Sequence, residues 1–244
     1  MAYKEVTGNL FASDAMALVN TVNCVGAMGK GIALEFRRRY PEMFKQYQVD
    51  CDKKKLVPGR IYYYPSEDRL ILNFSIKNDW KYPSKIQWIE SCLRQFTADY
   101  KQKGIISIAF PWMGAENGGI PLELIQSTMR KYLEPLEEID IEIYSFDPSA
   151  YDPLFDQLKK IANSEDYESY QKLSGIKDKA YRKIIDSVRD QTIKGMSELS
   201  RIDGIGKTTI DNLYIFLSKL LHQSILLNNQ TKASQNIQPP LFEL

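Results

Sequence analysis

Two glycine-rich loops are the densest chemical signal in this sequence. In residues 23–33, Asn-Cys-Val-Gly-Ala-Met-Gly-Lys-Gly-Ile-Ala, three glycines fall within six positions, after an apolar run and before a helical pattern. In residues 114–119, Gly-Ala-Glu-Asn-Gly-Gly, three more follow the apolar stretch 105–110. Glycines in such loops let backbone N–H groups approach a phosphate, and the positive end of a helix favours the same charge. Two such loops at one edge of a sheet predict a ligand that carries two phosphates.

Neither common nucleotide-binding motif is matched. No Ser or Thr follows Gly29-Lys30 to bind magnesium, as a Walker A loop requires, and the Rossmann spacing Gly-x-Gly-x-x-Gly is absent from the first loop. The alternative is that these glycines only form tight turns. The presence of both loops, together with Asn20 and Asn23, favours a binding site.

The elements that must position these loops alternate between strand and helix over residues 1 to 147. Apolar and aromatic runs predict strands at 17–20, 59–64, 70–74, 105–110 and 139–146. Helical spacing of apolar residues predicts helices at 31–40, 83–100 and 121–133, with Ser84 as an N-cap. This alternation predicts an α/β sheet with helices on both faces.

After residue 149 the strong segments are all helical, at 154–162, 180–188 and 208–221. Residues 172–219 hold ten Lys and Arg against six Asp and Glu, whereas the first 150 residues hold nineteen of each. Residues 224–240 are rich in Asn, Gln, Ser and Thr, a composition typical of disorder. The predicted organisation is an α/β domain over 1–149, a helical domain over 150–223 and a disordered tail over 224–244.

The composition excludes several classes of protein. The chain has 32 Lys and Arg against 31 Asp and Glu, so its net charge of +1 gives no general attraction to nucleic acid or membranes. No apolar run approaches the ~18 to 20 residues of a membrane span, and the first ten residues lack the apolar core of a signal peptide. Three scattered cysteines and a single histidine, His222, exclude a disulfide framework and a multi-histidine metal site. We expect a monomer in the reducing cytoplasm, with no membrane contact, metal or cofactor.

The first loop and two shorter segments resemble a known family. Gly8-Asn9-Leu10 and Ala17 to Ala33 (Ala-Leu-Val-Asn-Thr-Val-Asn-Cys-Val-Gly-Ala-Met-Gly-Lys-Gly-Ile-Ala) are similar to the macrodomain, a fold that binds ADP-ribose. The run Met-Gly-Lys-Gly-Ile-Ala and the segment 73–80, Asn-Phe-Ser-Ile-Lys-Asn-Asp-Trp, narrow the resemblance to macrodomains of the DarG type, which remove ADP-ribose from DNA, and to the related terminal ADP-ribose glycohydrolases. The resemblance covers residues 1–147. It implies a three-layer α/β/α domain with a mixed central sheet, followed here by a small all-α domain.

The resemblance also implies site residues, position by position. The lysine that cleavage needs in this family falls on Lys77, within Asn-Phe-x-x-Lys-x-x-Trp. Asn23, in preference to Asn20, would seat the distal ribose and take part in cleavage. Adenine would lie at Asn9 and Leu10, where many macrodomains have an Asp that accepts a hydrogen bond from the adenine amino group. The loops would hold the distal ribose and the two phosphates through Gly26, Met28, Gly29, Gly31, Ile32, Gly114, Ala115, Asn117, Gly118 and Gly119.

The reaction implied is cleavage of a glycosidic bond at C1″ of ADP-ribose, through an oxocarbenium-like transition state. Lys77 would attack C1″ directly if burial and a cation such as Lys81 lower its pKa, or it would stay charged and stabilise the leaving group. Human-type terminal glycohydrolases have an acidic residue after the second glycine loop, which resolves a lysyl intermediate. This chain has Gly118 at that position, as expected for the DarG branch. Glu116 would act as an acid or base, or would weaken phosphate binding by repulsion. Trp112 and Tyr82 would either stack on a base or pack against other parts of the protein.

A second motif lies in the predicted helical domain. Residues 199–213 resemble a helix-hairpin-helix unit, in which the turn Gly204-Ile205-Gly206 would present N–H groups to a DNA phosphate and Lys207 would add charge. Residues 173–185 resemble a degenerate first copy. Two alternatives are a helical hairpin that uses glycine only for its turn, and a region that binds a DarT toxin, as the region after the macrodomain does in DarG.

The function implied is hydrolysis of ADP-ribose from ADP-ribosylated DNA, with thymidine as the modified nucleoside, by an antitoxin to a DarT-type DNA ADP-ribosyltransferase. Two alternatives stay open. One is a reader that binds ADP-ribose without cleaving it, and the other is a toxin-binding partner whose macrodomain no longer acts.

Overall fold

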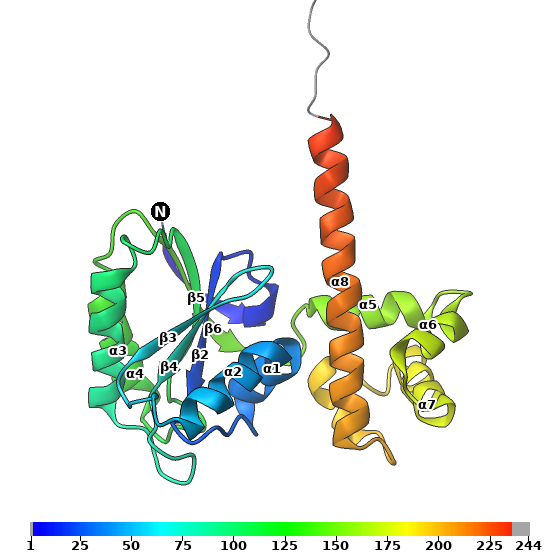
Figure 1. Ribbon diagram of the computed structural model, residues 1–244, viewed down its shortest axis with the longest axis horizontal. Coiled ribbons are helices and arrows are strands. Elements are labelled where there is room, and N and C mark those ends of the chain that lie inside the picture. The colour runs from blue at the N-terminus through cyan, green and yellow to red at the C-terminus, as the bar shows by residue number, and fades with distance from the viewer. Residues whose placement is uncertain (1, 236–244) are drawn as a thin grey trace, which may run out of the picture. The chain divides into compact units, whose positions relative to one another are not determined.

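The structure is a computed structural model that describes residues 2–235. The chain divides into two compact units, and the boundary in the sequence lies between Asp152 and Pro153 (Figure 1). The first unit combines a sheet with helices, and the described part of the second consists of helices. The first unit has two apolar cores, one on each face of the sheet, and the second unit has one apolar core among its helices.

A six-stranded sheet forms the centre of the first unit. Its spatial order is β1-β6-β5-β2-β4-β3, and β3 alone runs antiparallel to its neighbour. The predicted mixed sheet is therefore confirmed. Because β5, β2 and β4 are parallel neighbours, the loops after them lie at the same edge of the sheet. The strands are β1 (Tyr3–Gly8), β2 (Ala17–Val22), β3 (Ile61–Pro65), β4 (Leu70–Ser75), β5 (Ser107–Pro111) and β6 (Asp140–Phe146).

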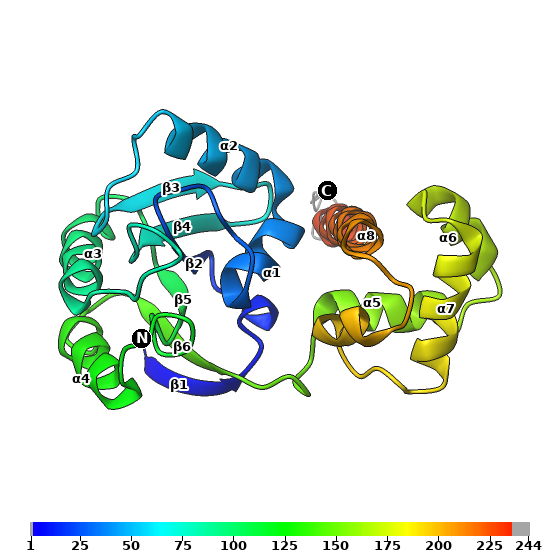
Figure 2. The ribbon, with the colours of Figure 1, turned by 90° about the horizontal axis from the view of Figure 1, so that it is seen from below.

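Two pairs of helices cover the two faces of the sheet. Figures 1 and 2 show α3 and α4 on one side and α1 and α2 on the other, so the predicted three-layer α/β/α arrangement is confirmed. A short 3-10 helix, Leu10–Ala12, follows β1. The four helices are α1 (Gly31–Arg39), α2 (Pro41–Asp52), α3 (Ile86–Asp99) and α4 (Leu122–Leu133).

Strand β2 shows how the sequence produces these layers. Its side chains alternate between the cores: Ala17 and Val19 lie under α3 and α4, whereas Leu18 and Val22 lie under α1 and α2. A strand covered on both faces reads as a continuous apolar run. Two positions of β2 are polar: Asn20 is fully buried and Thr21 is partly buried.

The second unit consists of α5 (Pro153–Ala162), α6 (Tyr167–Ser174), α7 (Asp178–Arg189), a 3-10 helix (Met196–Arg201) and α8 (Lys207–Gln235). Helix α8 includes residues 224–235, where the sequence predicted a disordered tail. Its first turns pack into the core through Ile210, Leu213 and Leu217, and a helix that has nucleated adds one hydrogen bond for each further residue. Residues 236–244 of the predicted tail lie outside the described residues. Between residues 2 and 235, every helix is too short or too polar to cross a bilayer.

Candidate functional site

The two glycine loops and Lys77 come together at the carboxyl edge of the sheet. The first loop follows β2, the second follows β5, and Lys77 lies two residues after β4. The strand order therefore places the first loop between the other two segments. Backbone hydrogen bonds join them: the Lys77 amide donates to the Val22 carbonyl (3.3 Å), and the Cys24 amide donates to the Asn78 carbonyl (3.1 Å).

The first loop takes its shape from Asn23. The Asn23 side-chain oxygen accepts from the amides of Val25 (3.0 Å) and Ala27 (3.3 Å), and its Nδ2 donates to the Ala27 carbonyl (2.5 Å). The Tyr47 hydroxyl, on α2, lies 2.8 Å from the Asn23 carbonyl oxygen and 3.0 Å from its side-chain oxygen. Both ends of the Asn23 amide are thus engaged in holding the loop. Tyr47 was not found by sequence reasoning, which predicted no helix at α2.

The exposed backbone of this loop leads into α1. Gly29 and Gly31 are exposed, Gly26 and Ile32 are partly buried, and Met28 is buried beneath them. Lys30 precedes α1 and forms no capping hydrogen bond through its side chain. The first N–H groups of α1 therefore keep no side-chain partner at their cap, as an anion site at a helix start requires.

The second loop closes tightly on itself. The Gly114 carbonyl accepts from the Ile120 amide (3.1 Å), and Gly114 has a left-handed φ of +80°. Gly118 packs against it so closely that an added Cβ would lie 2.3 Å from the Gly114 carbonyl oxygen. The Gly118 carbonyl in turn accepts from the Ser84 amide (2.9 Å), which joins the loop to the segment before α3. Gly119, with φ +72°, completes the turn.

Asn117 connects the second loop to the rest of the site. Its carbonyl oxygen accepts from the Lys77 ammonium (2.5 Å). Its side-chain nitrogen lies 2.6 Å from where a Cβ at Gly31 would stand, so the start of α1 and the second loop touch. Ala115 is partly buried and Glu116 is exposed in the same loop. The segments predicted to share a ligand are therefore in contact through one residue.

Burial lowers the pKa of Lys77 below its usual value. Lys81, which the sequence suggested as a neighbouring cation, does not contribute to this pKa shift; its ammonium lies over the Trp80 ring, 5.6 Å from the centroid. Among residues 2–235, no group of three or more His, Cys, Asp or Glu is placed to hold a metal ion. The reactive group that the site offers is a partly desolvated amine.

Asn20 lies inside the sheet, beneath the first loop. Its Nδ2 donates to the side-chain oxygen of Asn73 (2.8 Å), its register partner on β4, and its own oxygen has no hydrogen-bond partner within the described chain. Asn20 is 0% exposed, so the structure does not bring it to the surface of the site. Asn73 was not singled out from the sequence, because cross-strand pairing is invisible there.

Asn9 lies at the far end of the same edge, after β1. Its side-chain oxygen accepts from the Phe11 amide (3.1 Å) and caps the 3-10 helix, in which Leu10 is buried. The exposed aromatic Phe146 ends β6 in register with Gly8, beside Asn9, and was not predicted. Trp112 is partly buried, and its indole N–H donates to the Ser145 hydroxyl (3.0 Å), which favours its packing role.

The predicted DNA-binding turn lies in the second unit. Gly204 has φ +76°, and an added Cβ at Gly206 would meet no atom of residues 2–235 within 4 Å. Lys207 opens α8. Lys183 on α7, which sequence reasoning missed, donates from its ammonium to the Asp203 carbonyl (2.9 Å) in this turn. Two lysines therefore lie at this turn, Lys207 within it and Lys183 in contact with it from α7.

The degenerate first copy shares a left-handed glycine with this turn but carries different charges. Gly175 has φ +65° and is followed by the buried Ile176, as Gly204 is followed by Ile205. At the position of Lys207 stands Asp178, which opens α7. A carboxylate at a helix start occupies the place where an anion would bind.

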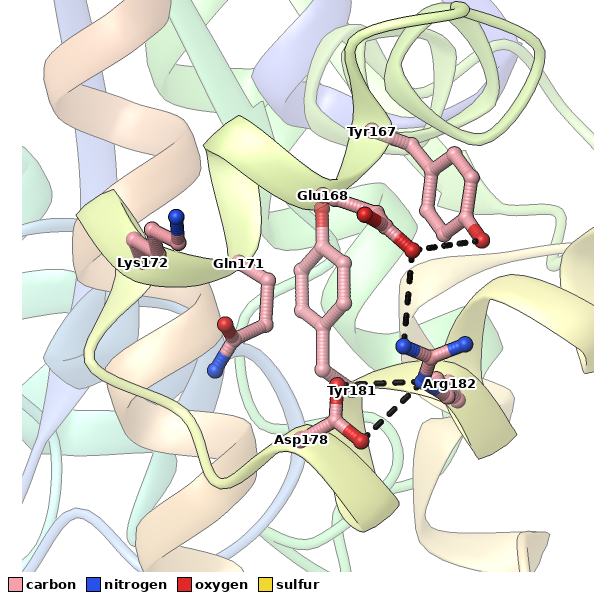
Figure 3. A pocket seen from close by; sticks show the side chains of 7 residues that line it. All are labelled: Tyr167, Glu168, Gln171, Lys172, Asp178, Tyr181 and Arg182. Atoms are coloured by element: carbon pink, nitrogen blue, oxygen red, sulfur yellow. Dashed lines mark hydrogen bonds and ion pairs between the residues drawn. The ribbon is translucent and has the colours of Figure 1, made fainter.

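A small hollow lies between α6 and α7 beside this first turn (Figure 3). Its volume is about 160 Å³, which is room for a few water molecules. Arg182 pairs with Asp178 (3.0 Å) and Glu168 (3.4 Å), and the ring of Tyr181 lies between Gln171 and Arg182. The hollow is too small for a dinucleotide, and its charges are largely paired with one another.

The first unit matches known proteins. A family model described as Macro domain matches residues 19–129. A DNA ADP-ribosyl glycohydrolase from Thermus aquaticus is 37% identical over 143 residues, which cover 57% of this chain and 40% of that protein. The chain thus spans about two fifths of the length of this curated relative.

Two solved structures are similar to the same part of the chain. The macrodomain of Mycobacterium tuberculosis DarG superposes with a TM-score of 0.54 and 39% identity, covering 56% of this chain and 93% of that one. Thermosipho africanus DarTG in complex with ADP-ribose superposes with a TM-score of 0.56 and 32% identity, covering 62% and 44%.

Proposed function

This chain belongs to the macrodomain family, and we propose that its first unit is a hydrolase that removes ADP-ribose from ADP-ribosylated DNA, with modified thymidine as the expected substrate. The observation that carries the proposal is the position of Lys77, a partly desolvated amine at the junction of two glycine loops. The name of the Thermus aquaticus relative and the ADP-ribose complex of the Thermosipho structure support it.

We place ADP-ribose along the carboxyl edge of the sheet. The two phosphates would bind the backbone N–H groups of the glycine loops and the start of α1, where Gly29 and Gly31 leave the backbone exposed. The distal ribose would lie near the first loop, whose shape Asn23 maintains. Adenine would lie at Asn9, with the exposed ring of Phe146 as a stacking surface.

In the proposed reaction Lys77 acts on C1″ of the distal ribose. A neutral lysine donates its lone pair to C1″ while the bond from C1″ to the base breaks; that electron pair leaves with the base, which takes up the proton that the alkylated Lys77 nitrogen releases. Water then attacks C1″, the bond from C1″ to Nζ breaks with its electron pair returning to Lys77, and the proton that the water loses passes to this nitrogen as ADP-ribose is released. A lysine that stays charged would instead stabilise the leaving group. Burial favours the neutral form, because it disfavours the ammonium, so we favour direct attack.

We expect kcat to rise with pH and to level off below pH 10.5, the usual pKa of lysine, because the reactive neutral form of Lys77 grows as pH passes its lowered pKa. The measurement is a pH profile of ADP-ribose release at saturating substrate. A kcat that instead falls as pH rises through this range would assign catalysis to the charged ammonium.

The proposed activity is tested by incubating the full chain with ADP-ribosylated single-stranded DNA and measuring free ADP-ribose. A reader that binds without cleaving is the alternative. It would bind free ADP-ribose in calorimetry and release none from the DNA.

We further propose that the chain reverses the work of a DNA ADP-ribosyl transferase of the DarT type, in the cytoplasm. The name of the Thermosipho africanus relative joins such a transferase and a glycohydrolase in a single protein, which supports this pairing of activities. A vestigial macrodomain on a toxin-binding protein predicts the opposite: neutralisation of the transferase would then not require release of ADP-ribose.

For the second unit we propose binding of DNA backbone phosphates by the turn 203–207. The exposed Gly206 leaves the backbone accessible, and Lys183 and Lys207 supply positive charge on either side of the turn. Such contacts carry no sequence information, which suits an enzyme that must find a modified base in any sequence.

The double variant Lys183→Gln/Lys207→Gln should weaken binding of the full chain to unmodified duplex DNA and lower the slope of log K against log salt by about 1.8, the value for two lost phosphate contacts. Fluorescence anisotropy at several salt concentrations gives both quantities. The matched control is Lys159→Gln/Lys160→Gln on α5, which removes equal charge from lysines that pair with Asp156. Equal slopes for the two variants would contradict a phosphate site at the turn.

A further inference from the structure

The segment from Asn78 to Lys85 exposes two aromatic side chains directly after Lys77. Trp80 is 58% exposed and Tyr82 is 65% exposed, although both belong to a segment between β4 and α3 that is otherwise well anchored. Single exposed apolar residues are ordinary on protein surfaces. Two large aromatic rings within three positions, beside a reactive group, need a partner to account for them.

Hydrogen bonds at both ends hold this segment in place. The Asn78 carbonyl accepts from the Cys24 amide of the first loop (3.1 Å), and the Ser84 amide donates to the Gly118 carbonyl of the second (2.9 Å). Between them, Asp79 accepts from the amides of Lys81 (2.9 Å, through its carboxylate) and Tyr82 (3.2 Å, through its carbonyl). The rings are therefore carried on a turn that is fixed to both ligand loops before anything binds.

Positive charge is interleaved with the rings. The Lys81 ammonium lies 5.6 Å from the Trp80 ring centroid, and the Lys85 ammonium lies 4.9 Å from that of Trp88. Neither lysine forms an ion pair within the part of the chain that the structure describes, whereas the Asp79 carboxylate is engaged with a backbone amide. Exposed aromatic rings alternating with unpaired cations are the chemistry by which proteins bind single-stranded nucleic acid.

The place of the segment specifies which part of the substrate would reach it. If Lys77 acts at C1″, the bond from C1″ to the DNA base lies at Lys77, so the strand must leave the site there; this step rests on the proposed function. Trp80 is three residues from Lys77, which limits their Cα separation to about 11 Å. The nucleotides next to the modified one are therefore within reach of the rings.

We propose that Asp79–Lys85 is a single-strand platform, on which bases flanking the ADP-ribosylated nucleotide stack against Trp80 and Tyr82 while Lys81 and Lys85 contact the adjoining phosphates. The platform makes the preferred substrate a modified base within an unpaired strand of several nucleotides. An ADP-ribosylated mononucleoside would be bound and cleaved without its help.

The test compares the full chain with Trp80→Ala/Tyr82→Ala. Binding of an ADP-ribosylated single-stranded oligonucleotide, followed by anisotropy, should weaken about 5- to 100-fold. Binding of free ADP-ribose should stay within about twofold, which also shows that the variant is folded. Trp80→Phe/Tyr82→Phe should restore most of the oligonucleotide binding, because every aromatic ring offers a stacking face. The control is Tyr151→Ala, an aromatic ring of similar exposure outside the segment.

A second variant examines the charges. Lys81→Gln/Lys85→Gln should lower the salt dependence of oligonucleotide binding by about 1.4 in log K against log salt, as expected for two contacts to a single strand. Unchanged oligonucleotide binding in both double variants would overturn the platform.

Failure of the platform and failure of the proposed function give different results. If the platform is wrong but the function is right, the unaltered chain releases ADP-ribose from both the oligonucleotide and the mononucleoside. The ratio of kcat/KM for the oligonucleotide to kcat/KM for the mononucleoside is then the same in Trp80→Ala/Tyr82→Ala as in the unaltered chain. If the function is wrong, the unaltered chain releases nothing from either substrate, and the anisotropy measurement still decides whether the rings bind a strand.

Discussion

Replacement of Lys77 by alanine should lower kcat for release of ADP-ribose from single-stranded DNA by about 10³-fold. The reason is that the Lys77 ammonium lies at the junction of the two loops, 2.5 Å from the Asn117 carbonyl, and burial makes it easier to deprotonate than a surface lysine. No other lysine hydrogen-bonds to the second loop within the described chain. Steady-state release of ADP-ribose, with calorimetry of free ADP-ribose, measures the effect.

The affinity of Lys77→Ala for free ADP-ribose should stay within about threefold, because in the proposed complex backbone N–H groups, which the substitution leaves in place, bind the phosphates. Lys77→Arg separates the two roles of the lysine. Arginine keeps the positive charge but is not a nucleophile at ordinary pH, so it should be as inactive as alanine if Lys77 attacks C1″. Turnover that survives in Lys77→Ala would exclude Lys77 as the catalytic group.

Replacement of Gly118 by alanine should abolish ADP-ribose binding and lower the free energy of unfolding of the first unit by about 3 kcal/mol. The added methyl group would lie 2.3 Å from the Gly114 carbonyl oxygen and 2.4 Å from its Cα. These are backbone atoms within a closed loop, so they cannot move aside as a side chain could. Denaturant unfolding and calorimetry measure the two effects.

Gly29→Ala is the matched control for stability. A Cβ at Gly29 would meet no atom of the described chain within 4 Å, and the φ of Gly29 is not left-handed, so the free energy of unfolding should change by less than about 0.5 kcal/mol. A Gly118→Ala protein that unfolds at the same denaturant concentration as Gly29→Ala would show that the second loop relaxes freely. The tight packing at Gly118 would then carry no cost.

The layers of the first unit were predictable because its central strands are apolar on both faces. Helix α2 was not predicted. Its apolar residues include Tyr47, Val49 and Cys51, whose alternate spacing resembles a strand, while Met43, Tyr47 and Cys51 alone show the helical period. The prediction that Ser84 is the N-cap of α3 is wrong, because Lys85 occupies that position. The Ser84 hydroxyl is buried and has no hydrogen-bond partner among the described residues.

The candidate site was predictable to the extent that backbone conformation determines it. Glycines at 114, 118 and 119 mark a loop that other residues cannot form, and this is visible in a sequence. The side-chain contacts were not visible, because they join residues far apart in the chain. Tyr47 reaches Asn23 across 24 positions, and Asn73 reaches Asn20 across 53.

The hydrogen bond from Lys77 to Asn117 joins the reactive amine to the loop that would hold the pyrophosphate. Any ligand that shifts this loop alters the surroundings of the amine and so its affinity for a proton. By reciprocal linkage, the proton then alters the affinity for that ligand by the same factor. Affinity for ADP-ribose and basicity of Lys77 are thus two measurements of one coupling, and calorimetry in buffers of different ionisation enthalpy would report it as protons taken up or released on binding.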